Sequence, residues 1–369
     1  MLKQRWDKLT RSMEAAKASG IALMPGPNMF YLTGLLMGLS ERPTLLVIGE
    51  EDRACLIMPE LEKQKGWVVA DRLRSQGIGA EFGVYSYTDE EGPHKAFQKA
   101  LRGQTGSWAL EYTGLRMLEY SLMKEAMGEF SWVDAGGVMK PLRMVKDEDE
   151  LANMQQAARL ADMGAHIASK LLAPGKRATQ IALEIEWQLK QEGADRVYMS
   201  LATGPDTAIP HAGTSSRVIE PGDLAWLDLC VNVAGYWSDI TRTYPVGGIS
   251  DELRRIYEVV VEAQEAARTK AKLGMSGADV DALAREVIDS YGYGDKFIHR
   301  TGHGLGLEIH EEPYIVASNN NPLPVGSTFT IEPGIYLPGK GGVRVEDDVV
   351  LTGEGAKSLT DYPRDLLNM

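Results

Sequence analysis

The most constraining feature of this sequence is an aspartate in the middle of an almost continuous apolar run. Asp228 lies within LAWLDLCV, residues 224–231. Such a run is typical of a strand that is buried on both faces of a sheet. An ionised carboxylate in that setting costs on the order of several kcal/mol unless a cation or a proton accompanies it. The fold must therefore cover this strand and still supply Asp228 with a partner.

A second aspartate follows eleven residues later, in WSDIT, residues 237–241. The intervening residues 233–236 (VAGY) favour a hairpin turn. This turn would bring the Asp228 and Asp239 side chains together. Because side chains alternate along a strand, Asp239 and Thr241 share one face. An isolated surface aspartate at each position is the alternative interpretation.

Two glutamates repeat this pattern downstream. Glu332 lies inside the apolar run FTIEPGIY, residues 329–336. In GVRVED, residues 342–347, alternation predicts that Arg344 and Glu346 lie on one face and the valines on the other. A shared cation explains four acids in apolar strands better than four separate surface positions do.

One histidine completes the set. Three of the six histidines of the chain fall within residues 299–310, and glycines surround His303 in GHGLG. Glycine permits close approach of neighbouring backbone. The predicted cluster comprises four carboxylates and one imidazole: Asp228, Asp239, His303, Glu332 and Glu346.

The donor types of this cluster indicate a hydrolytic metal site. Two divalent cations would balance its four carboxylates, and an oxygen-rich set with one imidazole suits Mn²⁺, Co²⁺ or Fe²⁺. A pair of such ions lowers the pKa of water and polarises a carbonyl, which is the chemistry of amide hydrolysis.

The composition excludes several other classes of protein. A net charge of −13 disfavours nucleic acid as a partner. The glycines near His303 match neither a dinucleotide-binding fingerprint nor a P-loop. Two distant cysteines fit a reducing compartment, and we find no apolar signal core and no membrane-spanning run. We therefore expect a cytoplasmic protein without a membrane anchor.

The periodicity predicts two domains, residues 1–140 and 141–369. The first is expected to be α/β: a helix before Gly20, then strands at 21–24, 44–48, 54–58, 84–87 and 108–110. An acidic helix start at 147–150 opens the second domain and continues to about residue 172. Further helices are expected at 178–192, 251–273 and 277–291.

These motifs resemble the pita-bread-fold metallopeptidases, which include proline-specific aminopeptidases, prolidases and methionine aminopeptidase, with creatinase as a metal-free relative. The residues that carry the resemblance are DLAWLDLCVNVAGYWSDITRT, HRTGHGLGLEIHEEP, TIEPGIY and GVRVEDDVV. Residues 29–34 (MFYLTG) resemble the prolidase and creatinase branch. The resemblance implies an α+β fold, in which a pita-bread catalytic domain follows a smaller, creatinase-like N-terminal α/β domain.

The resemblance also implies roles for single residues. The five clustered residues match the metal ligands of the family, and Glu332 matches its general base as well. His211 and His310 resemble its substrate-binding and proton-handling histidines, and Arg344 an arginine near the active site. The implied cofactor is a pair of divalent ions, Mn²⁺ or Co²⁺ with Zn²⁺ or Fe²⁺ as alternatives. The implied substrates are short peptides with an Xaa-Pro bond, and the implied assembly is a homodimer.

Two positions depart from the family pattern. Cys230 replaces a glycine that is frequent in relatives, and we expect it to affect packing only. Tyr314 stands where some prolidases have an arginine that grips the carboxylate of a dipeptide, which leaves dipeptidase and aminopeptidase activity both open. Arg42 could supply that contact from the other subunit of a dimer; a solvated loop charge is the alternative.

Two other functions compete with peptide hydrolysis. One is a creatinase-like C–N hydrolase that acts on a small non-peptide amide, and the other is a non-catalytic peptide-binding member of the family. The complete set of ligand residues argues against both, because creatinase works without metal and binding-only members lose ligands.

Overall fold

The computed structural model describes residues 2–49, 53–79 and 81–365. The chain forms two compact units, Met1–Arg143 and Met144–Met369. Helix α6 (Gly136–Met144) contains the boundary expected near residue 140, and its last residue belongs to the second unit.

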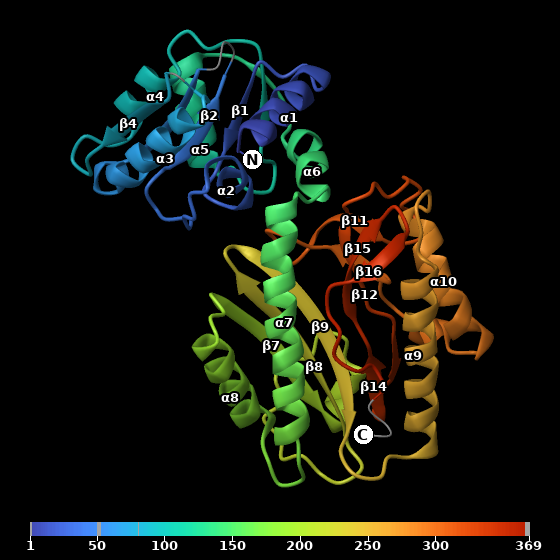
Figure 1. Ribbon diagram of the computed structural model, residues 1–369. Helices are drawn as coiled ribbons and strands as arrows, with labels where there is room; N and C mark the ends of the chain where they lie inside the picture. Colours follow the sequence, from blue (N-terminus) through green and yellow to red (C-terminus); the bar gives the residue numbers. More distant parts are fainter. Residues whose placement is uncertain (1, 50–52, 80, 366–369) are drawn as a thin grey trace. The chain divides into compact units, whose positions relative to one another are not determined.

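The first unit is built on a six-stranded sheet in the order β4-β3-β2-β1-β5-β6 (Figure 1). Its strands are β1 (Gly20–Leu23), β2 (Leu45–Ile48), β3 (Ala54–Pro59), β4 (Gly83–Tyr87), β5 (Ser107–Leu110) and β6 (Ser131–Asp134). Its helices are α1 (Leu2–Ala15), α2 (Pro27–Thr33), α3 (Lys63–Ser75), α4 (His94–Ala100), α5 (Met117–Met127) and α6, with a 3₁₀ turn at Glu60–Glu62.

The predicted strands of this unit are confirmed, and the sequence missed one. The interior strands β1, β2 and β3 are buried at every residue, so they read as apolar runs. Strand β6 lies at the edge of the sheet and is mostly exposed. It carries no apolar run that periodicity could detect.

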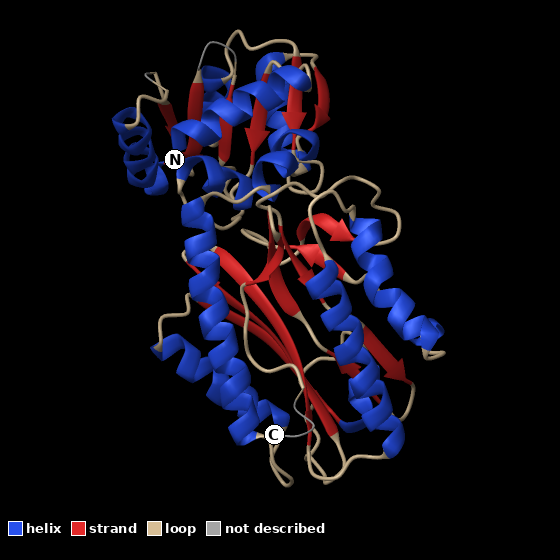
Figure 2. Cartoon of the chain, turned by 45° about the vertical axis from the view of Figure 1, so that its right-hand side comes forward, coloured by secondary structure: helices blue, strands red, loops and turns tan. Residues whose placement is uncertain are grey.

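The second unit contains three small antiparallel sheets and four helices (Figure 2). Its helices are α7 (Glu148–Leu171), α8 (Ala178–Gln191), α9 (Asp251–Lys270) and α10 (Gly277–Ser290), with 3₁₀ turns at Gly204–Ala208 and Gly294–Lys296. The long helix predicted after residue 147 begins with a capping box: Asp147 accepts from the Glu150 backbone N–H, and the Glu150 side chain accepts from that of Asp147.

Three sheets carry the residues of interest. The first contains β7 (Arg196–Thr203), β8 (Leu224–Val233) and β9 (Tyr236–Pro245). The second has the order β11-β10-β12-β15-β16, formed by β10 (Gly302–Gly304), β11 (Glu311–Ile315), β12 (Thr328–Ile331), β15 (Asp347–Thr352) and β16 (Gly355–Ser358). The third pairs β13 (Gly334–Leu337) with β14 (Gly341–Arg344).

Helices pack against the outer sides of these sheets. Helix α7 lies along β8 and β9, while α9 contacts β14 and β16 and α10 contacts β11 (Figure 1). The apolar side chains between helices and strands form one large core cluster. A bridge between Thr241 on β9 and Glu346 joins the first sheet to the segment between β14 and β15.

Among the described residues, no helix combines the length and apolar character needed to cross a membrane.

Candidate metal centre

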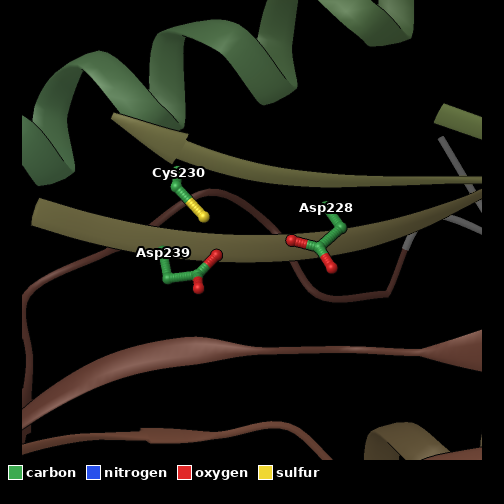
Figure 3. A group of neighbouring side chains, drawn as sticks. All are labelled: Asp228, Cys230 and Asp239. Carbon is green, nitrogen blue, oxygen red and sulfur yellow. The ribbon is translucent and has the colours of Figure 1, made fainter. Parts of the chain in front are cut away.

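The two aspartates are brought together by the β8–β9 hairpin. Its turn residues Ala234 and Gly235 have φ values of 50° and 90°, the left-handed conformations that a two-residue hairpin loop requires. Asp228 then pairs with Thr241, and Cys230 pairs with Asp239. Paired residues and their neighbours at i+2 share a face, so all four side chains lie on the same side of the hairpin. Figure 3 shows Asp228, Cys230 and Asp239 directed into one space.

His303 is held between two strands by the glycines that flank it. It is the central residue of β10, which pairs with β11 on one side and β12 on the other. A Cβ atom at Gly302 would lie 1.9 Å from the Thr330 carbonyl oxygen, and one at Gly304 would lie 2.3 Å from that of Glu312. No side chain larger than a hydrogen fits at either position. The glycines therefore fix the close strand spacing that buries His303.

The two glutamates follow strands of the second and third sheets. Glu332 comes directly after β12, and Glu346 lies between β14 and β15. The Glu346 backbone N–H donates to the Thr241 carbonyl at 3.0 Å, and the Thr241 hydroxyl donates to the Glu346 carboxylate at 2.6 Å. These bonds hold Glu346 against the hairpin that carries the aspartates.

All five predicted ligand residues line one cavity of about 530 Å³. Potential ligand atoms of Asp239, His303 and Glu346 lie within 4.8 Å of one another. The His303 Nε2 atom lies 3.4 Å from a carboxylate oxygen of Glu332. Residues separated by more than 100 positions in the chain thus converge on a space large enough for ions and a small substrate.

Several carboxylate oxygens in this cavity lack the partner that burial requires. Asp239 and Glu346 are only 4% and 2% exposed. Yet Asp239 Oδ1 and Glu346 Oε1 form no hydrogen bond. Buried polar atoms are normally satisfied, so these two oxygens indicate ligands for a cation. The donor set fits a pair of divalent ions.

Burial and mutual repulsion oppose ionisation of these acids in the metal-free chain. Burial, with the Asp228 charge, raises the pKa of Asp239 well above its usual range. Burial, with the Asp239 charge, does the same to the pKa of Glu346. Burial raises the pKa of Glu332 to about 7, although the Arg344 guanidinium opposes this shift. Burial lowers the pKa of His303 to about 3, which leaves its imidazole neutral and able to coordinate a cation.

Arg344 is occupied by protein groups. Its guanidinium donates to an Asp228 carboxylate oxygen at 2.6 Å, to the Tyr336 hydroxyl and the Pro210 carbonyl at 3.0 Å, and to the Thr241 hydroxyl at 3.2 Å. It also lies over the Trp226 ring at 4.6 Å. Arg344 is thus fixed beside Asp228 and has little capacity left for a substrate.

Three histidines besides His303 line the cavity. His211 and His310 are exposed on its wall. The His310 ring lies edge-on to His303, with centroids 4.2 Å apart, and partial desolvation and the Arg300 charge lower the pKa of His310. Both nitrogens of His299 are engaged, by the Arg300 carbonyl at 2.8 Å and the Tyr336 hydroxyl at 2.9 Å. His299 therefore shapes the loop, whereas His211 and His310 present free ring nitrogens.

The structure corrects the expectation for Cys230. It lines the cavity, and its sulfur lies within 4.8 Å of carboxylate oxygens of Asp228 and Asp239. A thiol at this place lies among the candidate ligands themselves and not only in the packing behind them. The sequence pattern could have indicated this, because Cys230 is two residues from Asp228 and so shares its face.

Two residues proposed for substrate binding do not line this cavity. Tyr314 lies outside its wall, and its ring is covered by the Arg300 guanidinium at 4.5 Å. Arg42 belongs to the first unit, where both carboxylate oxygens of Asp89 accept from it at 2.8 Å. Arg300, to which no sequence motif assigns a role, does line the cavity. Its only sequence signal is its position three residues before His303.

Comparison with known proteins extends these observations to the whole chain. Residues 152–353 match metallopeptidase family M24, and residues 5–145 match the creatinase/prolidase N-terminal domain. The Xaa-Pro dipeptidase of Pyrococcus furiosus is 36% identical, over 99% of this chain and 100% of its own. That of Lactobacillus helveticus is 34% identical, over 98% and 97%.

A solved structure gives the same result in three dimensions. The prolidase of Thermococcus sibiricus superposes with a TM-score of 0.90 at 36% identity, over 99% of this chain and 98% of its own. The prediction of a creatinase-like N-terminal domain followed by a pita-bread domain is thereby confirmed. This chain belongs to metallopeptidase family M24.

Proposed function

We propose that this protein is a dinuclear metallopeptidase that hydrolyses the Xaa-Pro bond of short peptides. The observation that carries the proposal is the convergence of four carboxylates and His303 on one cavity, with two buried carboxylate oxygens left without a hydrogen bond. Relatives that cover the whole chain are Xaa-Pro dipeptidases. The activity of these relatives and this donor set agree.

Five residues would hold the two ions: Asp228, Asp239, His303, Glu332 and Glu346. Divalent ions bound there would supply a nucleophilic hydroxide near neutral pH and a Lewis acid for the scissile carbonyl. Mn²⁺ or Co²⁺ suits this oxygen-rich set, with Zn²⁺ or Fe²⁺ as alternatives. The Arg344 contact orients Asp228, and the Thr241 hydroxyl orients Glu346.

The proton transfers fall to residues on the cavity wall. A carboxylate oxygen of Glu332 accepts a proton from the attacking water and passes it to the departing proline nitrogen. Ring N–H groups of His211 and His310 donate to the carbonyl oxygen as negative charge develops on it.

The nitrogen of proline explains why a dedicated enzyme is needed. The Xaa-Pro amide has no N–H, so a protease that recognises this donor binds such a bond poorly. A cavity in which His211 and His310 donate to the carbonyl oxygen of the scissile bond does not require an N–H group on its nitrogen. We also propose a cytoplasmic location, which the two buried, unpaired cysteines favour. A homodimer is proposed from the resemblance to the family alone.

The test is a peptide panel combined with metal analysis. Protein purified without chelator should contain about two divalent ions per chain and cleave Xaa-Pro peptides, but not matched Xaa-Ala peptides. Chelation should abolish activity, and Mn²⁺ or Co²⁺ should restore it. Full activity of metal-free protein would contradict the proposal and favour a creatinase-like hydrolase. Metal binding without hydrolysis of any peptide would favour a binding protein.

A further inference from the structure

We propose that Arg300 binds the free carboxylate of the substrate and so makes this protein a dipeptidase. This inference rests on the proposed Xaa-Pro activity and adds to it the length of the preferred peptide. It concerns a residue to which the sequence patterns assign no role.

Two arginines line the cavity, Arg300 and Arg344. Arg344 donates to Asp228, Tyr336, Pro210 and Thr241, so each of its three nitrogens already has an acceptor. Removing it from Asp228 would leave a carboxylate of the metal cluster without its partner. Arg344 is therefore a positioning residue for Asp228, and the cation available to a ligand is Arg300.

The Arg300 guanidinium forms no ion pair and no hydrogen bond with any residue in the described parts of the chain. It is half-buried, and it lies over the face of the Tyr314 ring, 4.5 Å from the ring centroid. A stacked guanidinium keeps its N–H groups in its own plane, where they match both oxygens of a carboxylate. The stacking contact thus orients Arg300 without using its donors.

Hydrogen bonds on both sides of Arg300 hold its main chain in place. The Arg300 carbonyl contacts His299 Nδ1 at 2.8 Å, and the Thr301 N–H donates to the Ile315 carbonyl at 3.1 Å. The second bond joins the strand segment of Arg300 to that of Tyr314. An arginine in place of Tyr314 would set two positive charges against each other, whereas tyrosine offers a π-face. Tyr314 and Arg300 therefore act as a pair.

The location agrees with the chemistry of a dipeptide. In Xaa-Pro, only the proline Cα separates the scissile nitrogen from the terminal carboxylate, so the cation that binds the carboxylate must lie close to the reacting groups. Arg300 lines the same cavity as His310 and Glu332. These are the residues to which proton transfer is assigned.

The experiment compares an Xaa-Pro dipeptide with its C-terminal amide, in which the carboxylate charge is absent and all other groups are retained. In Arg300→Gln, KM for the dipeptide should rise about 10- to 100-fold, the range for losing a charged hydrogen-bonding partner. KM for the amide should change less than about threefold, and the metal content should not change. Arg300→Lys should recover part of the affinity for the dipeptide, because it restores the charge but not the fork.

A matched control is available in Arg255, whose guanidinium lies over the Tyr291 ring at the same 4.5 Å but does not line the cavity. Arg255→Gln should leave both substrates unaffected. Equal losses on dipeptide and amide in Arg300→Gln would overturn the inference and make Arg300 a positioning residue for His310. A dipeptide-selective loss in Arg42→Gln, with none in Arg300→Gln, would assign the carboxylate to Arg42. If the unaltered enzyme cleaves neither substrate, the Xaa-Pro activity itself is wrong, and the inference falls with it.

Discussion

The carboxylates of this site carry more negative charge than the neighbouring protein groups balance. Asp239 and Glu346 are buried beside each other, and each keeps one oxygen without a hydrogen bond. In the metal-free chain such groups favour their protonated forms, because burial and like charges penalise ionisation. Divalent ions bound there would reverse that preference. In the proposed metal centre the same residues would serve as ligands and would destabilise the chain when no metal is bound.

At this scale the sharpest prediction concerns His310. Its ring contacts the His303 ring, and it lines the cavity. It is not one of the five proposed metal ligands. Replacement by alanine should lower kcat by about 100-fold or more, the range for losing a donor to developing charge. The metal content, measured by atomic absorption, should remain unchanged.

His94 provides the control for this replacement. It is exposed in the first unit, next to Glu125, and does not line the cavity. His94→Ala should retain the activity of the unaltered protein. If His310→Ala loses its ions, His310 is a ligand; if its rate is unchanged, His310 has no part in the chemistry.

Among the elements, the β8–β9 hairpin sets the geometry of the site. Its register places Asp228 and Asp239 on one face, and a shift by one residue would turn both aspartates to the opposite side. The register is set by the two-residue turn, in which Ala234 adopts a φ of 50°. That conformation costs about 1–2 kcal/mol for a residue with a Cβ atom. The turn is thus a point of strain in the same hairpin that carries the two aspartates.

The turn gives a prediction of opposite signs at adjacent positions. Ala234→Asn should stabilise the protein by about 0.5–1 kcal/mol, because asparagine tolerates the left-handed conformation and Asn-Gly favours this hairpin turn. Gly235→Ala, at a φ of 90°, should destabilise it by about 1 kcal/mol or more. Urea unfolding of the metal-loaded proteins measures both changes. The same sign for both variants would show that the turn conformation does not control stability.

For the molecule as a whole, metal binding and folding are coupled through pH. Burial raises the pKa of Asp348 to about 8 and that of Glu332 to about 7. The corresponding values in an unfolded chain are about 4. The folded metal-free protein therefore binds more protons than the unfolded chain between these limits. The contribution of these two groups to the free energy of unfolding is fully present below about pH 4. It is lost as the pH rises through about 7 and 8.

We predict that the melting temperature of the metal-free protein decreases as the pH rises from 5.5 to 8.5. Metal at about 100 times its Kd should add about 2.7 kcal/mol at the upper end of this range, which differential scanning calorimetry detects as a higher melting temperature. The decrease of the melting temperature with pH and the stabilisation by metal both test the charge balance of the buried carboxylates.

Asp348 allows its own share to be separated. The Ser238 hydroxyl and the Asp239 backbone N–H donate to one of its oxygens, and asparagine keeps an acceptor for both. Asp348→Asn should therefore reduce the fall in stability across this range. A melting temperature that rises with pH in metal-free protein would contradict the sign of these shifts.

Sequence patterns alone determined the local part of this molecule. Apolar runs predicted the interior strands, acidic residues marked the start of α7, and VAGY predicted the hairpin that unites Asp228 and Asp239. Each of these depends on interactions within a strand, a helix turn or a hairpin, which neighbouring residues specify. The edge strand β6, exposed and without an apolar run, was not predictable in this way.

Tertiary structure decided which charges are already paired. Asp228 and Arg344 are 116 positions apart, and only their contact shows that Arg344 is committed to the cluster. Arg300 and Arg344 look alike in the sequence. In the fold, Arg344 is surrounded by acceptors, whereas Arg300 lies over a tyrosine ring and lines the cavity. A side chain finds its partners across the fold and not along the chain, so its remaining capacity to bind a substrate becomes visible only when the strands are assembled.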